Sequence, residues 1–184
     1  MLDPMHTTII EDALRLLGKR IEYQEQIEIL LVGGAAGMLT NQLGQNRVTT
    51  DCDVMVYLPE HAMAVVELAA EQVAERLELS PTWLNSNVQL RADSLPDGWE
   101  SRRIWIGDYG LLRVYAASRL DLIAMKVLAG RDQDLEDLDA MRVRQDEVPF
   151  VREFLDTLPE KGTHQYEIDA AYELLDSLDL HDEQ

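Results

Sequence analysis

The sequence of 184 residues has a single cysteine, Cys52, and only four histidines, which are scattered along the chain. One cysteine excludes a disulfide within the chain, and no Cys/His cluster has the spacing of a structural zinc site. No window approaches about 18 uninterrupted apolar residues, and the first residues lack a basic segment followed by an apolar run. We therefore expect a soluble, cytoplasmic protein with no membrane partner.

The chain is also poor in basic side chains: 16 Lys and Arg stand against 35 Asp and Glu, for a formal net charge of -19. General nucleic-acid binding and binding to anionic membranes both need a basic surface, so this balance argues against them. Residues 91–131 are the exception, because they carry more basic than acidic side chains. These basic residues are Arg91, Arg102, Arg103, Arg113, Arg119, Lys126 and Arg131. An anionic ligand is therefore expected at this middle segment.

Apolar patterning predicts helices and strands in an order typical of an α+β protein. The run over residues 27–32 is β-branched and apolar and ends at Gly33-Gly34, which predicts a buried strand followed by a tight turn. The other predicted elements are a helix from Asp3-Pro4 to about residue 23, a short helix over 35–43, a strand over 51–57, a long helix from Pro59, a hairpin of 103–107 with 111–115, a helix opened by Ser118 and Asp121, and acidic helices from 132 to about 180. Residues 80–100 are predicted to be mostly loop.

This order predicts a small mixed β-sheet flanked by helices, with a helical C-terminal half. We expect a single domain over residues 1–184. Its α/β core spans about 1–116 and its helical part about 117–184. The acidic C-terminal helices carry an apolar stripe, which could pack within the domain or take a second subunit or a partner protein.

Two aspartates at the start of the second predicted strand are the first candidates for chemistry. Side chains alternate in a strand, so Asp51 and Asp53 point to one face while Cys52 points into the opposite layer as an inert core thiol. Two carboxylates held so close repel each other, and a divalent cation would neutralise them. Mg²⁺ prefers oxygen ligands of this kind, with Mn²⁺ as an alternative. The alternative is a purely structural role, in which the two aspartates cap an exposed strand edge.

The Gly33-Gly34 turn is the second candidate. Glycine lets a backbone approach a ligand closely, and the turn with the helix that follows offers N–H groups to a phosphate. Carboxylates that bind a metal, beside a phosphate cradle, belong to phosphoryl or nucleotidyl transfer. Alternatively, the two glycines only form a turn that starts a helix.

At this point the sequence resembles the nucleotidyltransferase superfamily, whose polymerase-β-like fold has a strand, Gly-Gly or Gly-Ser, a short helix and Asp-x-Asp. More narrowly, it is similar to bacterial minimal and abortive-infection-toxin (AbiEii-like) nucleotidyltransferases. The similarity spans roughly residues 27 to 140. It is carried by Gly33-Gly34, by Arg47-x-Thr49-x-Asp51-x-Asp53, and by a later segment in which Lys126 and Arg131 precede Asp134 and Asp137.

The resemblance implies a role for each matching residue. Gly33 and Gly34 would bind phosphates through their backbone, with Arg47 and Thr49 close to the nucleotide. Asp51 and Asp53 would be catalytic metal ligands, and Lys126 and Arg131 would contact the triphosphate. Arg47 could equally neutralise an aspartate, and the Lys126 and Arg131 side chains could instead pair with nearby Asp121 and Asp134.

Active members of the superfamily usually add a third carboxylate from a later strand. On the predicted strand over 111–115 the polar residue is Arg113, so this position is not acidic. Asp108, at the end of the preceding strand, is the nearest candidate for a third catalytic acid, and Asp121 follows on the next helix. A missing ligand would weaken two-metal catalysis.

The sequence therefore predicts a metal-dependent nucleotidyltransferase that moves a nucleoside monophosphate from a nucleoside triphosphate to a hydroxyl acceptor. The acceptor could be a small molecule, a protein or a tRNA end, and the net charge favours the first two. One alternative is a catalytically weak or inactive nucleotide-binding module of the same fold, of the toxin–antitoxin type. Another is an interaction domain whose acidic helices bind a basic partner.

Overall fold

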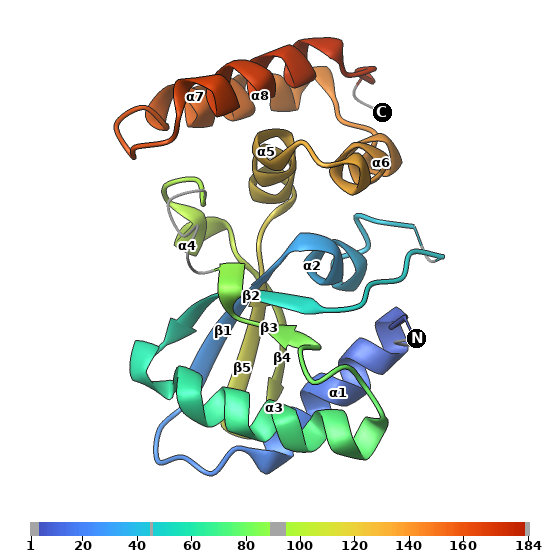
Figure 1. The fold of residues 1–184 in the computed structure, drawn as a ribbon, viewed down its shortest axis with the longest axis vertical. Coiled ribbons are helices and arrows are strands. Elements are labelled where there is room, and N and C mark those ends of the chain that lie inside the picture. The colour runs from blue at the N-terminus through green and yellow to red at the C-terminus, as the bar shows by residue number, and fades with distance from the viewer. Residues whose placement is uncertain (1–3, 45, 89–94, 183–184) are drawn as a thin grey trace. The chain divides into compact units, whose positions relative to one another are not determined.

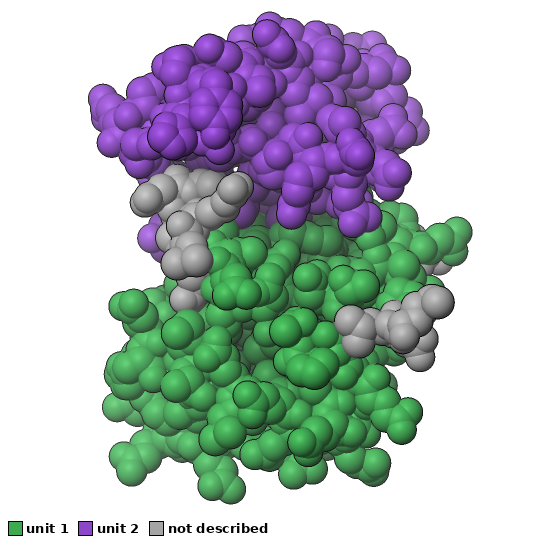
Figure 2. Space-filling view, in the orientation of Figure 1, with its two compact units in different colours: residues 1–92, 103–117 green, residues 93–102, 118–184 purple. Residues whose placement is uncertain are grey.

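The computed structural model describes residues 4–44, 46–88 and 95–182. It divides into two compact units, which Figure 2 distinguishes by colour. The first unit contains residues 1–92 and 103–117, and the second contains residues 93–102 and 118–184. Among the described residues, no helix is both long and apolar enough to cross a membrane.

The first unit is built on a five-stranded sheet in the order β3-β2-β1-β5-β4. Its strands are β1 (Ile27–Val32), β2 (Cys52–Leu58), β3 (Leu84–Asn85), β4 (Ile104–Tyr109) and β5 (Leu112–Ala116). Strand β1 is central, antiparallel to β2 and parallel to β5; β3 is parallel to β2, and β4 is antiparallel to β5. The sheet is mixed, as predicted, and the fold is α+β.

Three α-helices accompany the sheet: α1 (Thr7–Arg20), α2 (Gly33–Leu39) and α3 (Met63–Leu77), the last preceded by the 3-10 turn Glu60–Ala62. Helices α1 and α3 pack on each other, and α3 runs across the strands in Figure 1. Their buried faces include Ile10, Leu14 and Leu17 of α1 and Val66 and Val73 of α3, each fully buried. These residues recur at helical spacing, which is why both helices could be predicted.

The prediction that the first helix begins at Asp3-Pro4 is wrong. Helix α1 begins at Thr7, and Met5 instead forms an isolated antiparallel bridge with Thr49. The Met5 amide donates to the Thr49 carbonyl at 2.7 Å, and the Thr49 amide returns a bond at 3.1 Å. Burial of the Met5 side chain favours this extended pairing over another helical turn.

The second unit is helical. It contains α4 (Trp99–Arg102), α5 (Arg119–Ala129), α6 (Asp132–Met141), the 3-10 turn Gln145–Glu147, α7 (Val148–Thr157) and α8 (Gln165–Ser177). Helix α5 packs against α6, α7 and α8 and is the centre of this unit. The Ser118 hydroxyl accepts a hydrogen bond from the Asp121 amide, which confirms the predicted start of α5.

Candidate functional site

The sheet brings Gly33 and Asp53 together at the end of β1. Asp53 pairs with Val32, the last residue of β1, and Gly33 follows directly as the first residue of α2. A Cβ built on Gly33 would lie 2.7 Å from Asp53 Oδ2, and the Gly33 φ is +67°. Only glycine adopts this conformation without strain and leaves room for the carboxylate. Gly33 and Asp53, two of the predicted site residues, are therefore close neighbours.

Gly34 lies beside two further predicted residues. A Cβ on Gly34 would be 3.4 Å from an Arg47 guanidinium nitrogen and 3.5 Å from Thr49 Oγ1. The bridge between Met5 and Thr49 fixes the backbone of this loop. Arg47 and Thr49 thus border the glycine turn.

Asp51 and Asp53 flank Cys52 at the start of β2. Cys52 is fully buried, whereas both aspartates are half-buried, so the predicted alternation of faces is observed. The Thr49 hydroxyl lies 3.4 Å from Asp51 Oδ1, within hydrogen-bond range. Burial, and then the nearby charges of Asp51 and Asp53, raise the pKa of the Cys52 thiol far above its ordinary value. The thiol is therefore neutral and fits the predicted inert role.

Asn85 completes the cluster, and the sequence analysis did not predict it. It lies on β3 in register with Asp53, and its amide nitrogen donates to Asp53 Oδ1 at 2.8 Å. Its own carbonyl oxygen accepts a bond from the Asn87 backbone amide at 3.0 Å. The only sequence signal is a polar residue directly after buried Trp83 and Leu84, which does not reveal its partner strand.

Asp108, the predicted third acid, lies elsewhere in the sheet. Through Arg113 of β5, Asp108 is in register with Glu28, near the start of β1. Asp53 instead pairs with Val32, at the other end of β1. Asp108 is thus about 13 Å from Asp53 along the strands and about 14 Å across them. Hydrogen bonds from Arg113 also hold the pKa of Asp108 below its ordinary value. Asp108 does not join the aspartate pair, because β5 and β1 separate β4 from β2.

Lys126 and Arg131 belong to the second unit and contact carboxylates of α6. The buried Lys126 ammonium is 2.6 Å from Asp137 and 3.3 Å from Asp134. The Arg131 guanidinium is 2.7 Å from Asp134, although its side chain is 74% exposed. These contacts match the alternative in which the two cations form ion pairs within the protein.

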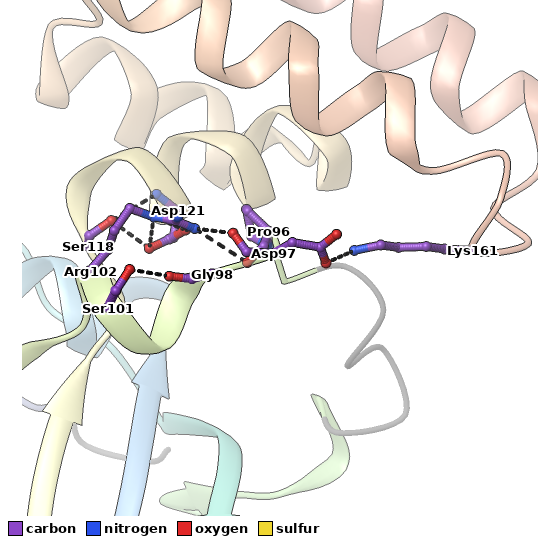
Figure 3. Close-up of polar contacts among 8 residues, drawn as sticks. All are labelled: Pro96, Asp97, Gly98, Ser101, Arg102, Ser118, Asp121 and Lys161. Atoms are coloured by element: carbon purple, nitrogen blue, oxygen red, sulfur yellow. Dashed lines mark hydrogen bonds and ion pairs between the residues drawn. The ribbon is translucent and has the colours of Figure 1, made fainter.

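Asp121, the other acid considered for the third position, is fully buried in the second unit, and Figure 3 shows its polar contacts. Its carboxylate accepts a bond from Arg102 at 2.6 Å and one from the Ser118 hydroxyl at 2.5 Å. Arg102 also donates to the Asp97 carbonyl, and Lys161 pairs with the Asp97 side chain at 2.7 Å. These bonds attach the segment of residues 95–102 to the helices of the second unit.

The residues around the glycine turn fit a divalent cation. The donors are carboxylate oxygens, the type that Mg²⁺ binds, and Gly33 leaves space beside Asp53 that a Cβ would fill. Within the described ranges, no group of three or more His, Cys, Asp or Glu side chains is arranged to hold a metal ion. Mg²⁺ in enzymes often has only one or two protein carboxylates, with waters and substrate phosphates as its other ligands. Asp51 and Asp53 suit that arrangement.

A mixed sheet with a glycine turn beside an Asp-x-Asp strand is the architecture expected of a nucleotidyltransferase. A family model described as "Nucleotidyltransferase of unknown function (DUF6036)" matches residues 7–175. The chain belongs to this family, and the match covers both compact units. Comparisons with curated proteins and with solved structures give no match.

Proposed function

We propose that the protein is a metal-dependent nucleotidyltransferase that transfers a nucleoside monophosphate from a nucleoside triphosphate to a hydroxyl group. The observation that carries the proposal is the position of the Asp53 carboxylate close beside the Gly33 turn, with Asp51, Arg47 and Thr49 nearby. Membership of a nucleotidyltransferase family supports the same activity. Mg²⁺, or Mn²⁺ in its place, is the proposed metal.

Each residue of the cluster has a defined part in this proposal. Asp51 and Asp53 hold the divalent cation, which when bound would offset the negative charge of the phosphates. Gly33 and Gly34 let the triphosphate approach the backbone without a clash. Arg47, which borders Gly34, would add a guanidinium for a phosphate oxygen. Lys126 and Arg131 are not part of the proposal, because their contacts are with α6 carboxylates.

In the reaction, the acceptor oxygen forms a bond to the α-phosphorus, the bond to the β-phosphate oxygen breaks, and pyrophosphate leaves. The acceptor proton must go to a carboxylate of the pair or to water, because the neutral amide of Asn85 cannot accept it. A small molecule, a protein side chain and a tRNA end all carry a suitable hydroxyl. The net charge of -19 favours the first two acceptors over a long nucleic acid.

The test is transfer of label from each of the four α-labelled nucleoside triphosphates in the presence of Mg²⁺. Candidate acceptors are added separately as a small-metabolite extract, a protein extract and bulk tRNA. We expect transfer with the wild-type protein and with Asp108→Ala, and loss of transfer with Asp53→Ala. Equal transfer by the wild type and Asp53→Ala would refute the proposed metal ligand.

A second candidate function is favoured by one observation, the amide of Asn85 beside Asp53 on the neighbouring strand. A carboxylate at this place would give the site a third acidic ligand, and its absence favours a weak or inactive nucleotide-binding module, such as an interaction partner of the toxin–antitoxin type. This module would bind Mg²⁺ with a nucleoside triphosphate and show no transfer to any of the three acceptor classes.

A further inference from the structure

Asn85 contacts Asp53 in a way that defines the orientation of both side chains. The amide nitrogen donates to Asp53 Oδ1, while the amide oxygen accepts from the Asn87 backbone. A flipped amide would place oxygen against oxygen and N–H against N–H, so both bonds require the same orientation. The Asn85 side chain is therefore fixed at both ends.

The two oxygens of the Asp53 carboxylate have different neighbours. Oδ1 accepts the hydrogen bond from Asn85, and Oδ2 lies 2.7 Å from the position that a Cβ on Gly33 would take, which the glycine leaves open. The backbone pairing of Asp53 with Asn85 in parallel β2 and β3 fixes the distance between the two residues. Rotation of the Asp53 carboxylate would break its hydrogen bond with the Asn85 side-chain amide, so Asn85 limits that rotation.

We propose that Asn85 is a positioning residue that holds Asp53 in the orientation in which it binds a divalent cation. The inference rests on the proposed function, because it concerns the same metal site. Neutral hydrogen-bond donors behind a metal-binding carboxylate orient it, and their loss typically weakens metal binding about 10- to 100-fold. Asn85 does this without adding a third negative charge to the site.

The first test compares the affinity for Mn²⁺, measured from the electron paramagnetic resonance signal of the free ion, between the wild type and Asn85→Ala. We expect a dissociation constant about 10-fold higher or more in Asn85→Ala. The matched control is Ser86→Ala, which removes the 2.7 Å bond between Ser86 and Tyr57 of β2. The control loosens the same pair of strands but leaves Asp53 untouched, so its Mn²⁺ affinity should equal that of the wild type.

The second test uses Asn85→Asp, which has nearly the same shape and replaces the donor with a carboxylate. Two like charges would then lie at hydrogen-bond distance, so we expect the melting temperature without metal to fall. Mn²⁺ relieves this repulsion, and the rise in melting temperature on adding Mn²⁺ should be larger than in the wild type. This variant gives an answer even where Asn85→Ala folds poorly.

The outcomes separate this inference from the proposed function. Wild-type protein that binds no Mn²⁺ would overturn both, because Asp53 would have no cation to bind. Wild-type binding with an unchanged affinity in Asn85→Ala would overturn the positioning role alone. The positioning role would also fail if Mn²⁺ raised the melting temperature of Asn85→Asp no more than that of the wild type.

Discussion

The acidic side chains of the two units have different surroundings. In the second unit, Asp121, Asp134, Asp137 and Glu147 are buried, and each lies beside an Arg or Lys of the same unit. In the first unit, Asp51 and Asp53 are half-buried beside a glycine turn, and Thr49 and Asn85 are among their hydrogen-bond partners.

This difference supports two roles for the acidic side chains of the chain, of which the second is the metal binding proposed above. A buried carboxylate is stable only when a cation and hydrogen bonds replace water, and the second unit supplies both from its own residues. Asp51 and Asp53 are half-buried beside the Gly33-Gly34 turn, which has no Cβ atoms, so a cation from solution can reach them. Net charge alone could not separate these groups.

The largest expected effect is the fall in stability when the buried cation of the second unit, Lys126, is removed. Lys126→Met leaves Asp134 and Asp137 without the ammonium that contacts both, and we expect a loss of about 3–5 kcal/mol in the free energy of unfolding. The measurement is urea denaturation. Arg131→Ala, which removes a mostly exposed cation, is the control and should cost less than about 1 kcal/mol.

Unchanged stability of Lys126→Met would contradict the difference between the acidic residues of the two units. A Lys126→Met protein as stable as the wild type, with weakened triphosphate binding, would restore the ligand role that the resemblance implied for Lys126.

A smaller effect is expected at the glycine turn of the first unit. Gly33→Ala places a Cβ 2.7 Å from the Asp53 carboxylate at a positive φ, which should cost about 1–3 kcal/mol and weaken Mg²⁺-dependent nucleotide binding. Gly44→Ala is the matched control, because a Cβ there would have no heavy atom within 4 Å. The control should be close to neutral in both denaturation and nucleotide titration; equal behaviour of the two variants would remove the special role of Gly33.

The smallest effect concerns Cys52 beneath the aspartates. The pKa of the Cys52 thiol is higher in the folded protein than in the unfolded chain. The contribution of Cys52 to the free energy of unfolding is therefore fully present below the pKa of the unfolded thiol, and it is lost progressively as the pH rises above that value. One pH unit above the unfolded value, the wild type should lose about 1.4 kcal/mol relative to Cys52→Ala. Denaturation of both proteins at pH 7 and pH 9.5 measures this difference, and identical pH slopes would contradict the buried, neutral thiol.

The sequence was sufficient to predict the central strand and the aspartate pair. Apolar β-branched residues over 27–32 mark β1, and the two-residue period places Asp51 and Asp53 on one face. Both signals are local, because they depend only on neighbours in the chain.

The remaining parts depend on tertiary contacts. The pairing of Asn85 with Asp53 joins residues 32 positions apart through a strand of two residues, too short for a periodic signal. The hairpin with Asp108 was predicted, but the strand order that separates it from Asp53 was not. Lys126 was expected either to contact the triphosphate or to pair with Asp121 or Asp134, and its burial beside Asp134 and Asp137 follows only from the packing of α5 within the second unit.

The most direct test of the central claim is the melting temperature with Mg²⁺ and a nucleoside triphosphate, added separately and together, for the wild type, Asp53→Asn and Asp108→Asn. A ligand that binds only the folded state raises its stability, by about 2.7 kcal/mol at 100 times the dissociation constant. We predict that Mg²⁺ and triphosphate together stabilise the wild type and Asp108→Asn, and that Asp53→Asn shows no gain. Stabilisation of Asp53→Asn equal to that of the wild type would contradict the assignment of the metal and nucleotide site to the Gly33 turn.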